Sequence, residues 1–278
     1  MHPGTLYIVA TPLGNLGDLS HRAAEVLQGV PVVAAEDTRR TRALLSHLGA
    51  HPTLLSFHAH SGNRRAESLL EILRSGRDVA LVSDAGTPAV SDPGADLVHQ
   101  ARAAGYPIVP IPGPSAVAVA LSASGFNGDR YLFLGFIPRK GRERARLLTR
   151  AAAEEWSTVF FEAPSRVVHL LEDLRDRVGP DRLVVVAREL TKIHEDIRSG
   201  TLDAMVEYFT SAPVKGELTV VLQGTGSPEP EADRTEDALE QATSLLAEGL
   251  TRREVVRRLT ETLGIPRNDA YRLVMELP

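Results

Sequence analysis

The sequence predicts an α/β protein made of two α/β domains and a small C-terminal helical appendage. Through the first half of its 278 residues, short runs of β-forming residues alternate with amphipathic helical stretches, which is the rhythm of a parallel sheet with helices on its faces. The runs are almost entirely apolar, as strands buried on both faces are. Turn-forming residues at 125–129 interrupt the rhythm, and a second α/β series follows. We therefore expect domains at 1–124 and 125–224, with a linker and the appendage at 225–278.

The first domain is expected to consist of strand–helix pairs. In chain order they read LYIVA and LSHRAAEVLQ, VPVVAAE and TRRTRALLSHLG, TLLSF and NRRAESLLEILRSG, DVALVSD and GADLVHQARAAG, and PIVPIPG and SAVAVALSASG. The second domain is expected to read strand YLFLGF, a basic helix, strand STVFFEAP, helix RVVHLLEDLRDRVG, and strands RLVVVARELT and KGELTVVLQG. Beyond it, TGSPEPEAD has the composition of a linker. TRREVVRRLTETLG and RNDAYRLVMEL have helical periods around a turn and resemble a small helix-turn-helix.

The bulk composition excludes several classes of function. Hydrophobic residues make up 43% and charged residues 24% of the chain, as in ordinary globular proteins. The sequence has no cysteine, which excludes disulfides, thiolate catalysis and cysteine-built metal sites. No secretory signal opens the chain and no apolar run approaches the ~20 residues of a membrane span, so a cytoplasmic protein is expected. The net charge of −5 gives no general attraction to nucleic acid, so such a role needs a local basic patch.

The loop after the first expected strand, TPLGNLGDLS, has the position of a nucleotide-binding loop but not its residues. A Rossmann loop needs the pattern G-x-G-x-x-G, whereas this loop has only Gly14 and Gly17. A Walker A loop needs a Gly-Lys-Ser/Thr ending, which is also missing. A tight turn whose helix is capped by Asp18 or Ser20 explains the loop equally well.

Two later loops are better candidates for a ligand site. SDAGTPAVSDPG follows a buried strand, and its small residues let a ligand approach the backbone while Asp84 and Thr87 orient polar groups. In open α/β sheets ligands bind at the carboxyl ends of the strands. PGPSA, at 112–116, places a rigid turn before a helix whose free N–H groups could hold a carboxylate. The alternatives are a long turn with Asx motifs and a closely packed helix start.

Polar side chains at other strand ends are candidate catalytic groups. Glu36 and Asp37 end the VVAAED strand, with Arg39 beside them, although a plain helix cap explains them equally well. Further polar groups follow strands of the second domain, namely Glu162, Arg166, Arg188, Glu189 and Lys192. A carboxylate and an arginine at neighbouring strand ends can also be an ion pair that orients loops. The residues alone therefore do not identify a catalytic base.

A metal site has little support in the sequence. His58 and His60 are two residues apart and would lie on one side of an extended segment. They have no acidic neighbour in the sequence, so a polar loop is favoured. His194, beside Glu195 and Asp196, is interpreted as part of a solvated or substrate-facing cluster. We expect no metal.

A basic segment, PRKGRERARLLTR, spans Pro138 to Arg150. It contains one acidic residue, Glu143, and six basic residues, namely Arg139, Lys140, Arg142, Arg144, Arg146 and Arg150. Because the chain as a whole is acidic, this local patch predicts a surface for the phosphates of a nucleic acid. A solvated helix face is the alternative.

Motifs that occur in order along the chain make it similar to one family. TPLGNLGDLS, AEDTRRTRALL, SDAGTPAVSDPG, PGPSA, GFIPRKG, FEAPSR, ARELTK and KGELTVV together resemble the bacterial small-subunit (16S) ribosomal RNA cytidine 2′-O-methyltransferases. These belong to the class III S-adenosylmethionine methyltransferases that include the tetrapyrrole methylases. The resemblance covers about residues 5–223. It implies a parallel sheet in the first domain, a mixed sheet in the second, S-adenosylmethionine as cofactor, and methylation of a cytidine ribose in 16S ribosomal RNA.

Roles for individual residues follow from the resemblance, which implies the cofactor contacts and places the first loop at the acceptor, and from the polar strand ends and the basic segment described above. The expected cofactor contacts are Leu13, Asp84, Gly86, Thr87, Ser115, Ala116, Phe161 and Leu218. The expected RNA contacts are Pro12, Gly14, Asn15, Arg39, Arg139, Lys140, Arg166, Arg188 and Lys192. The candidate catalytic groups are Glu36, Asp37 and Glu162. The expected partners are 16S ribosomal RNA within the small ribosomal subunit and a second copy of the chain, with no membrane.

Two other classes of function compete with this interpretation. A methyltransferase of the same fold acting on a tetrapyrrole or another small molecule would favour a closed apolar pocket. A non-catalytic ribosome-binding protein would tolerate loss of the cofactor loops. The C-terminal appendage is expected to grip RNA through arginines at 252, 253, 257 and 258, or else only to cover a sheet edge.

Overall fold

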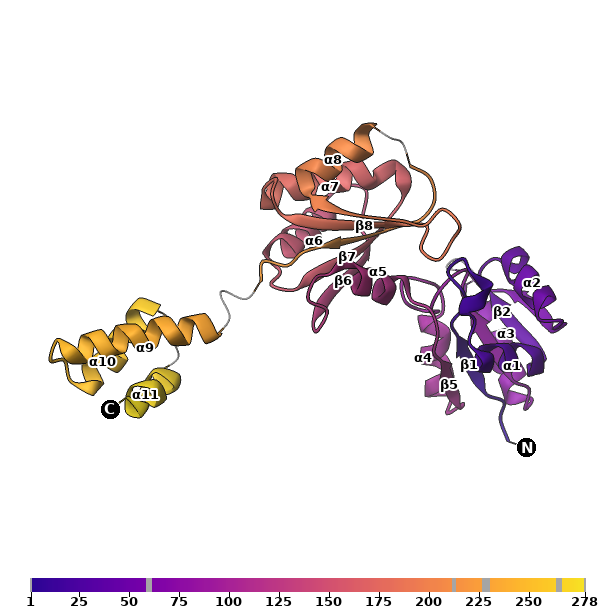
Figure 1. Cartoon of the computed structure of the whole chain (residues 1–278). Helices are drawn as coiled ribbons and strands as arrows, with labels where there is room; N and C mark the ends of the chain where they lie inside the picture. The colour runs from indigo at the N-terminus through magenta and orange to yellow at the C-terminus, as the bar shows by residue number, and fades with distance from the viewer. Residues whose placement is uncertain (1, 59–61, 212–213, 227–230, 264–266, 278) are drawn as a thin grey trace. The chain divides into compact units, whose positions relative to one another are not determined.

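The structure is a computed structural model that describes residues 2–58, 62–211, 214–226, 231–263 and 267–277. The chain forms two compact units, Met1–Gly224 and Thr225–Pro278, which are described separately (Figure 1). Of the helices in the described ranges, none is both long enough and apolar enough to span a bilayer.

The first sheet of the larger unit is parallel, with strand order β3-β2-β4-β1-β5. Its strands are β1 (Leu6–Val9), β2 (Val32–Ala35), β3 (Thr53–Ser56), β4 (Val79–Val82) and β5 (Ile108–Ile111). The helices that follow the first four strands are α1 (His21–Gly29), α2 (Thr38–His47), α3 (Gly62–Arg74) and α4 (Ala95–Ala103). The parallel α/β arrangement expected for the first domain is confirmed.

The apolar strands of this sheet are buried because helices cover both faces. Val33 and Ala35 pack in one core with α1 and α2, whereas Val32 and Ala34 pack in a second core with α3 and α4. This alternation follows from the two-residue period of a strand. Of the two caps considered for α1, Ser20 is the one used, since its hydroxyl accepts a hydrogen bond from the Ala23 N–H at 3.1 Å.

The second sheet is mixed, with order β6-β7-β10-β8-β9, as expected. Only the β6–β7 pair is parallel. The strands are β6 (Tyr131–Phe136), β7 (Ser157–Glu162), β8 (Leu183–Arg188), β9 (Asp196–Thr201) and β10 (Leu218–Leu222). The accompanying helices are α5 (Ala116–Ser124), α6 (Arg142–Ala153), α7 (Val167–Val178) and α8 (Leu202–Ser211). Two short 3-10 helices complete the unit, η1 (Leu16–Asp18) and η2 (Pro164–Arg166).

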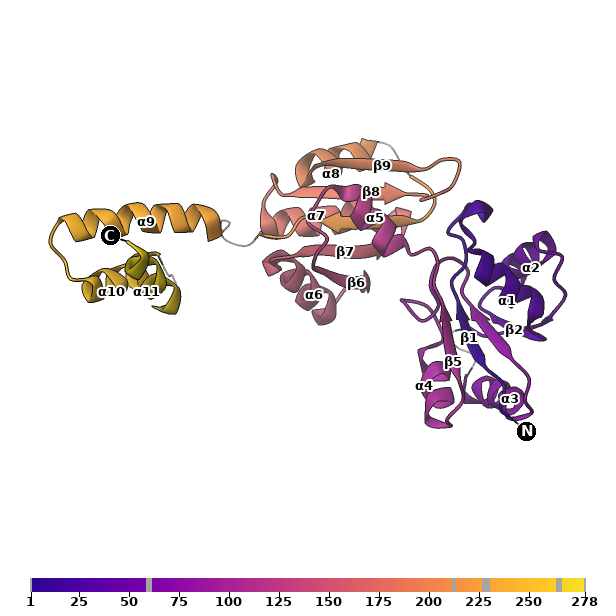
Figure 2. The same cartoon turned by 60° about the horizontal axis from the view of Figure 1, so that its bottom comes forward.

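Helices cover the two faces of this sheet unequally. Residues of α6, α7 and α8 share a core with Phe160 and Val220, which lie on one face. The other face is covered by α5, whose Ala120 packs in a core with Val159 and Val221 (Figure 2). Thus α5, which lies in the range expected for the first domain, packs on the second sheet. The domain boundaries proposed from the sequence stay a prediction.

The smaller unit contains three helices in its described part, α9 (Glu231–Ala247), α10 (Arg252–Leu263) and α11 (Arg267–Glu276). Their shared core includes Ala242, Val255 and Val274. A capping box starts α10: the carboxylate of Glu254 accepts a hydrogen bond from the Thr251 N–H at 2.9 Å, while the Thr251 hydroxyl faces the Glu254 N–H. Residues 227–230 of the expected linker and the turn at 264–266 lie outside the described residues.

Candidate functional site

A cavity of about 540 Å³ lies in the larger unit, where loops of the first sheet meet the second sheet. All eight residues expected to contact the cofactor line it, from Leu13 in the first loop to Leu218 at the start of β10. They come from five separate segments of the chain, so no single motif forms this cavity. A volume of this size is typical of pockets for cofactors and small ligands.

The loop after β4 forms one wall of the cavity, and backbone hydrogen bonds fix its shape. Thr11 and Gly86 exchange two such bonds, at 2.9 and 3.0 Å. Gly86 has a φ of 84°, a left-handed conformation that favours glycine. The Thr87 hydroxyl donates to the Pro114 carbonyl at 3.2 Å. The two loops singled out in the sequence therefore hold each other in place.

The opposite wall is apolar and belongs to the second sheet. Phe161 on β7 and Thr219 on β10 are directly paired, which brings Phe161 and Leu218 to the same end of the sheet. Phe136, at the end of β6, also lines the cavity, and its ring centroid lies 5.6 Å from that of Phe161. This wall can take the flat, apolar part of a ligand.

Carboxylates gather on the wall formed by the first sheet. Glu36, Asp84 and Asp92 all line the cavity. Burial raises the pKa of Glu36, and the neighbouring charges of Asp92 and Asp84 raise it further. Burial likewise raises the pKa of Asp92, with Asp84 and Glu217 acting in the same direction. Such a group of carboxylates favours a cationic ligand, which would relieve their mutual repulsion.

Glu162 is a buried carboxylate at the end of β7. Its Oε1 accepts a hydrogen bond from the Ala163 N–H at 2.8 Å and lies 3.0 Å from the Arg166 Nε, whereas its Oε2 has no hydrogen-bond partner among the described residues. Burial raises the pKa of Glu162, and the Ala163 N–H and Arg166 oppose that rise. Arg166 also donates to the carbonyl of Ile137. The geometry is that of an ion pair that orients the β6 and β7 loops, one of the two possibilities raised by the sequence.

Asp37 caps α2. Its carboxylate accepts the Arg39 N–H at 2.8 Å, and this backbone hydrogen bond is the main reason why the pKa of Asp37 is lowered. Its own N–H donates to the Asp84 carboxylate at 2.8 Å. Of the three candidate catalytic groups, Glu36 and Glu162 line the cavity, whereas Asp37 is not among its lining residues.

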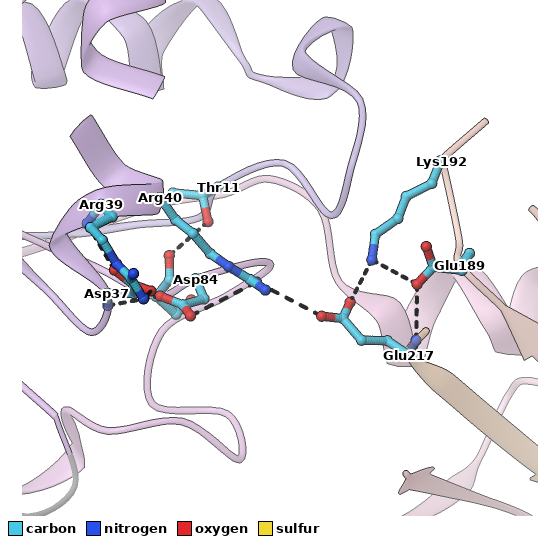
Figure 3. A network of polar contacts seen from close by, with 9 residues as sticks. Thr11, Asp37, Arg39, Arg40, Asp84, Glu189, Lys192 and Glu217 are labelled. Atoms are coloured by element: carbon cyan, nitrogen blue, oxygen red, sulfur yellow. Dashed lines mark hydrogen bonds and ion pairs between the residues drawn. The ribbon is translucent and has the colours of Figure 1, made fainter. Parts of the chain in front are cut away.

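A chain of ion pairs crosses from the first sheet to the second (Figure 3). The Arg40 guanidinium lies 3.8 Å from the Asp84 carboxylate and 3.9 Å from that of Glu217. The Lys192 ammonium lies 3.0 Å from Glu217 and 2.9 Å from Glu189. Lys192, one of the expected RNA contacts, is therefore held by two carboxylates in this structure.

A smaller cavity of about 220 Å³ adjoins the first. Pro12 and Gly14, both expected to contact RNA, line it, together with residues of α2. Leu13, Arg40 and Asp84 line both cavities. We call these two spaces the larger and the smaller cavity.

The other expected RNA contacts lie apart from the two cavities. Asn15 caps η1 by accepting the Gly17 N–H at 2.9 Å, and Arg39 is exposed on α2. Arg188 lies 4.0 Å from the Asp196 carboxylate. Arg139 and Lys140 are exposed just before α6.

The six basic residues of the segment 138–150 do not all lie on the surface. Arg144 is buried: its guanidinium pairs with Asp173 and donates to the Pro138 carbonyl at 3.0 Å. Arg146 pairs with Glu143 on the same helix. The expectation that all six basic residues form one patch is wrong for Arg144, because the face of α6 that packs on α7 buries it.

No group of three or more potential metal-ligating side chains occurs among the described residues. His60 lies outside them. His194 is exposed in the loop between β8 and β9. The absence of a metal stays a prediction.

Three charged residues that line the larger cavity were not among the candidates from the sequence, namely Arg40, Asp92 and Glu217. Arg40 and Asp92 stand inside the motifs AEDTRRTRALL and SDAGTPAVSDPG, and Glu217 is the glutamate of KGELTVV. The motifs could have suggested them, but only the fold shows which member of each motif faces the cavity.

The family model of the tetrapyrrole (corrin/porphyrin) methylases matches residues 5–206. The chain belongs to the tetrapyrrole methylase family. Two curated relatives of this tetrapyrrole methylase bear the name ribosomal RNA small subunit methyltransferase I. The one from Synechocystis sp. is 45% identical over 99% of this chain and 98% of its own length. The one from Escherichia coli O157:H7 is 41% identical over 98% of this chain and 95% of its own length.

Solved structures of other tetrapyrrole methylases share the fold. The cobalamin biosynthetic enzyme cobalt precorrin-4 methyltransferase aligns with a TM-score of 0.62 at 19% identity, over 79% of this chain and 94% of that one. Uroporphyrin-III C-methyltransferase from Thermus thermophilus, complexed with S-adenosylhomocysteine, aligns with a TM-score of 0.59 at 19% identity, over 79% and 97%. At these identities the similarity establishes the fold alone.

Proposed function

We propose that this protein methylates the 2′-oxygen of a cytidine ribose in 16S ribosomal RNA, with S-adenosylmethionine as methyl donor. The observation that carries the proposal is the larger cavity, where all eight residues expected to contact the cofactor come together. The names of the full-length relatives support ribosomal RNA of the small subunit as the substrate. The cytidine and the 2′-oxygen rest on the motif resemblance.

The cavity has the chemistry that this cofactor requires. Phe161 and Leu218 offer an apolar wall to the adenine ring, and the backbone at the start of α5 offers free N–H groups to a carboxylate. Glu36, Asp84 and Asp92 balance the cofactor's positive charge. When bound, S-adenosylmethionine supplies an activated methyl group, and the residues of the chain align the acceptor and exclude water.

A ribose hydroxyl must lose its proton to attack, so a base is expected near the acceptor. Glu36 and Glu162 line the cavity, and both have raised pKa values. We favour Glu36, because Arg166 and the Ala163 N–H already engage one oxygen of Glu162. Asp37 acts as a helix cap.

The cofactor is proposed to bind without a metal. Calorimetry with S-adenosylmethionine in the presence and absence of a chelator tests this. Equal affinities support the proposal, and loss of binding with the chelator contradicts it.

The RNA is proposed to contact Arg139, Lys140 and the smaller unit. The protein is proposed to act in the cytoplasm, as a homodimer, on the small ribosomal subunit. Light scattering of the purified protein measures the oligomeric state. A monomer at working concentration contradicts the homodimer.

Mass-spectrometric mapping of ribose methylation in 16S ribosomal RNA, from cells with and without this protein, tests the function itself. We expect one 2′-O-methylcytidine to disappear when the protein is absent and to return with the wild-type chain. An unchanged methylation map overturns the proposal. Methylation of a tetrapyrrole by the purified protein would support the alternative that the fold neighbours suggest.

A further inference from the structure

The two cavities meet at a shared wall. Leu13, Arg40 and Asp84 line both of them, so a group in the smaller cavity and a ligand in the larger one contact the same three residues. Methyl transfer needs the attacking oxygen and the methyl carbon about 3–3.5 Å apart. The smaller cavity is therefore well placed for the acceptor.

The size of the smaller cavity limits what it can hold. Its volume of about 220 Å³ is below the roughly 300 Å³ at which pockets for drug-sized molecules begin. A single nucleotide of a polymer fits this limit better than a tetrapyrrole macrocycle does. Pro12, Leu16 and Leu44 give it apolar surface, and Thr41 and Ser83 give it polar groups, a combination that suits a sugar with its base.

Among the described residues that line either cavity, Arg40 is the one lysine or arginine. Its side chain is 59% exposed, and its distances to Asp84 and Glu217, 3.8 and 3.9 Å, are longer than hydrogen bonds. Its N–H donors are thus available to an incoming oxyanion. A guanidinium binds a phosphate through two parallel hydrogen bonds.

We infer that the smaller cavity holds the acceptor nucleotide and that Arg40 binds its ribose-phosphate at the wall between the cavities. This inference rests on the proposed function and names the acceptor site for it. The nearby carboxylates would repel a phosphodiester, so Arg40 provides the attraction that brings the ribose beside the cofactor.

Two variants test the two parts of the inference. Arg40→Gln removes the cation. Ala43→Phe places a large side chain in the smaller cavity from the exposed face of α2. Arg42→Gln and Ser46→Phe are matched controls, because both residues are exposed on α2 and neither is among the lining residues. Thermal unfolding of each variant verifies that it is folded.

The readouts are single-turnover methylation of small ribosomal subunits and calorimetric affinity for S-adenosylmethionine. We expect Arg40→Gln to slow methylation at subsaturating subunit by about 10- to 10²-fold, the usual effect of losing a hydrogen bond to a charged group. Ala43→Phe should slow it by a similar factor. In Ala43→Phe the cofactor affinity should stay within about twofold of wild type, because Ala43 does not line the larger cavity. In Arg40→Gln the affinity for the cationic cofactor should not fall, because the variant removes a cation from beside Asp84. The controls should methylate as wild type does.

Three results overturn the inference. A full rate in either variant removes Arg40 or the smaller cavity from the acceptor site. A loss of cofactor affinity that matches the loss of rate in Arg40→Gln would mean that Arg40 only joins the two walls of the larger cavity. If the wild-type protein does not methylate the subunit at all, the proposed function fails and this inference with it, whereas the first two results leave the proposed function intact.

Discussion

The side chain of Lys192 packs directly against the backbone of Gly14, so closely that a Cβ on residue 14 would overlap the Lys192 Cγ. Gly14 belongs to the loop after β1, and Lys192 lies beyond β8 in the second sheet. The glycine is therefore needed for close approach between these two segments. Packing, and not the binding of a nucleotide, accounts for this glycine of the TPLGNLGDLS motif.

Replacing Gly14 with Ala tests this contact. The added methyl group displaces Lys192 from Glu189 and Glu217, and we expect the free energy of unfolding to fall by about 1–3 kcal/mol, the usual range for overpacking. Chemical denaturation measures it. Gly29→Ala is the control, since a Cβ on Gly29 meets nothing within 4 Å. Equal stabilities of the two variants would show that the contact does not matter.

Gly86 lines the larger cavity in a left-handed backbone conformation that favours glycine. The φ of 84° makes any Cβ strained at this position, and the Cβ would also lie 3.3 Å from Leu13. We expect Gly86→Ala and Gly86→Val both to lower the melting temperature, with Val lowering it more. Differential scanning calorimetry measures the melting temperatures, and an unchanged value would contradict backbone strain at residue 86.

Phe161→Ala is a better probe of the cofactor site and should weaken S-adenosylmethionine binding by about 10-fold, as the loss of an aromatic contact usually does.

The raised pKa values of Glu36 and Asp92 give cofactor binding a pH dependence. Because ionised carboxylates favour a cation, affinity for S-adenosylmethionine should rise as the pH increases through these raised values, starting above the ordinary values of 4.5 and 3.8. The free energy of unfolding of the ligand-free protein should fall over the same range. A carboxyl whose pKa is raised in the folded state favours folding while it is protonated, and this contribution is lost as the pH rises through the raised pKa. Calorimetry across a pH series should give a steeper rise for S-adenosylmethionine than for the uncharged thioether S-adenosylhomocysteine.

Asp92→Asn should flatten that pH dependence. Asp96→Asn makes the same charge change on α4, outside the cavity, and serves as its control. Identical pH profiles for the two cofactor forms would contradict electrostatic recognition of the sulfonium.

Arg139 and Lys140 are exposed residues of the basic segment and lie just before α6. Changing both to Ala should weaken RNA binding and reduce the salt dependence of binding by roughly one unit of slope for each phosphate that the variant no longer neutralises. Cofactor affinity should not change, because neither residue lines the larger cavity. Arg146→Ala, which removes an arginine paired with Glu143, is the comparison. An unaltered salt slope in the double variant would exclude this segment from the RNA-binding surface.

Deletion of residues 225–278 tests the smaller unit. The three helices of its described part have a core of their own, so we expect the larger unit to remain folded and to bind S-adenosylmethionine. Methylation of the ribosomal substrate should fall, because the arginines of α10 are removed. Full activity of the shortened chain would make the unit dispensable.

The sequence predicted the strands of the two sheets and the loops that line the larger cavity, for a physical reason. Buried parallel strands are apolar throughout, as in Val79–Val82, and the loops that follow them concentrate small residues. The burial and the orientation of single charged residues could not be predicted in this way. Arg144 is buried because it meets Asp173 on a different helix, and Arg40 faces the cavities because α2 presents that face to the loop after β1. Such pairings depend on how separate elements pack, which no local pattern contains.

The pairing of β1 has a consequence for how the chain folds during its synthesis. β1 is the first strand to be made, yet its two neighbours in the sheet are β4 and β5, with Leu6 beside Val79 and Ile108. At roughly 5–20 residues per second, this apolar strand leaves the ribosome several seconds before either neighbour has been translated. During that interval its backbone hydrogen-bonding groups have no partner strand in this sheet, so β1 can take its place between β4 and β5 only after Ile111 has been made.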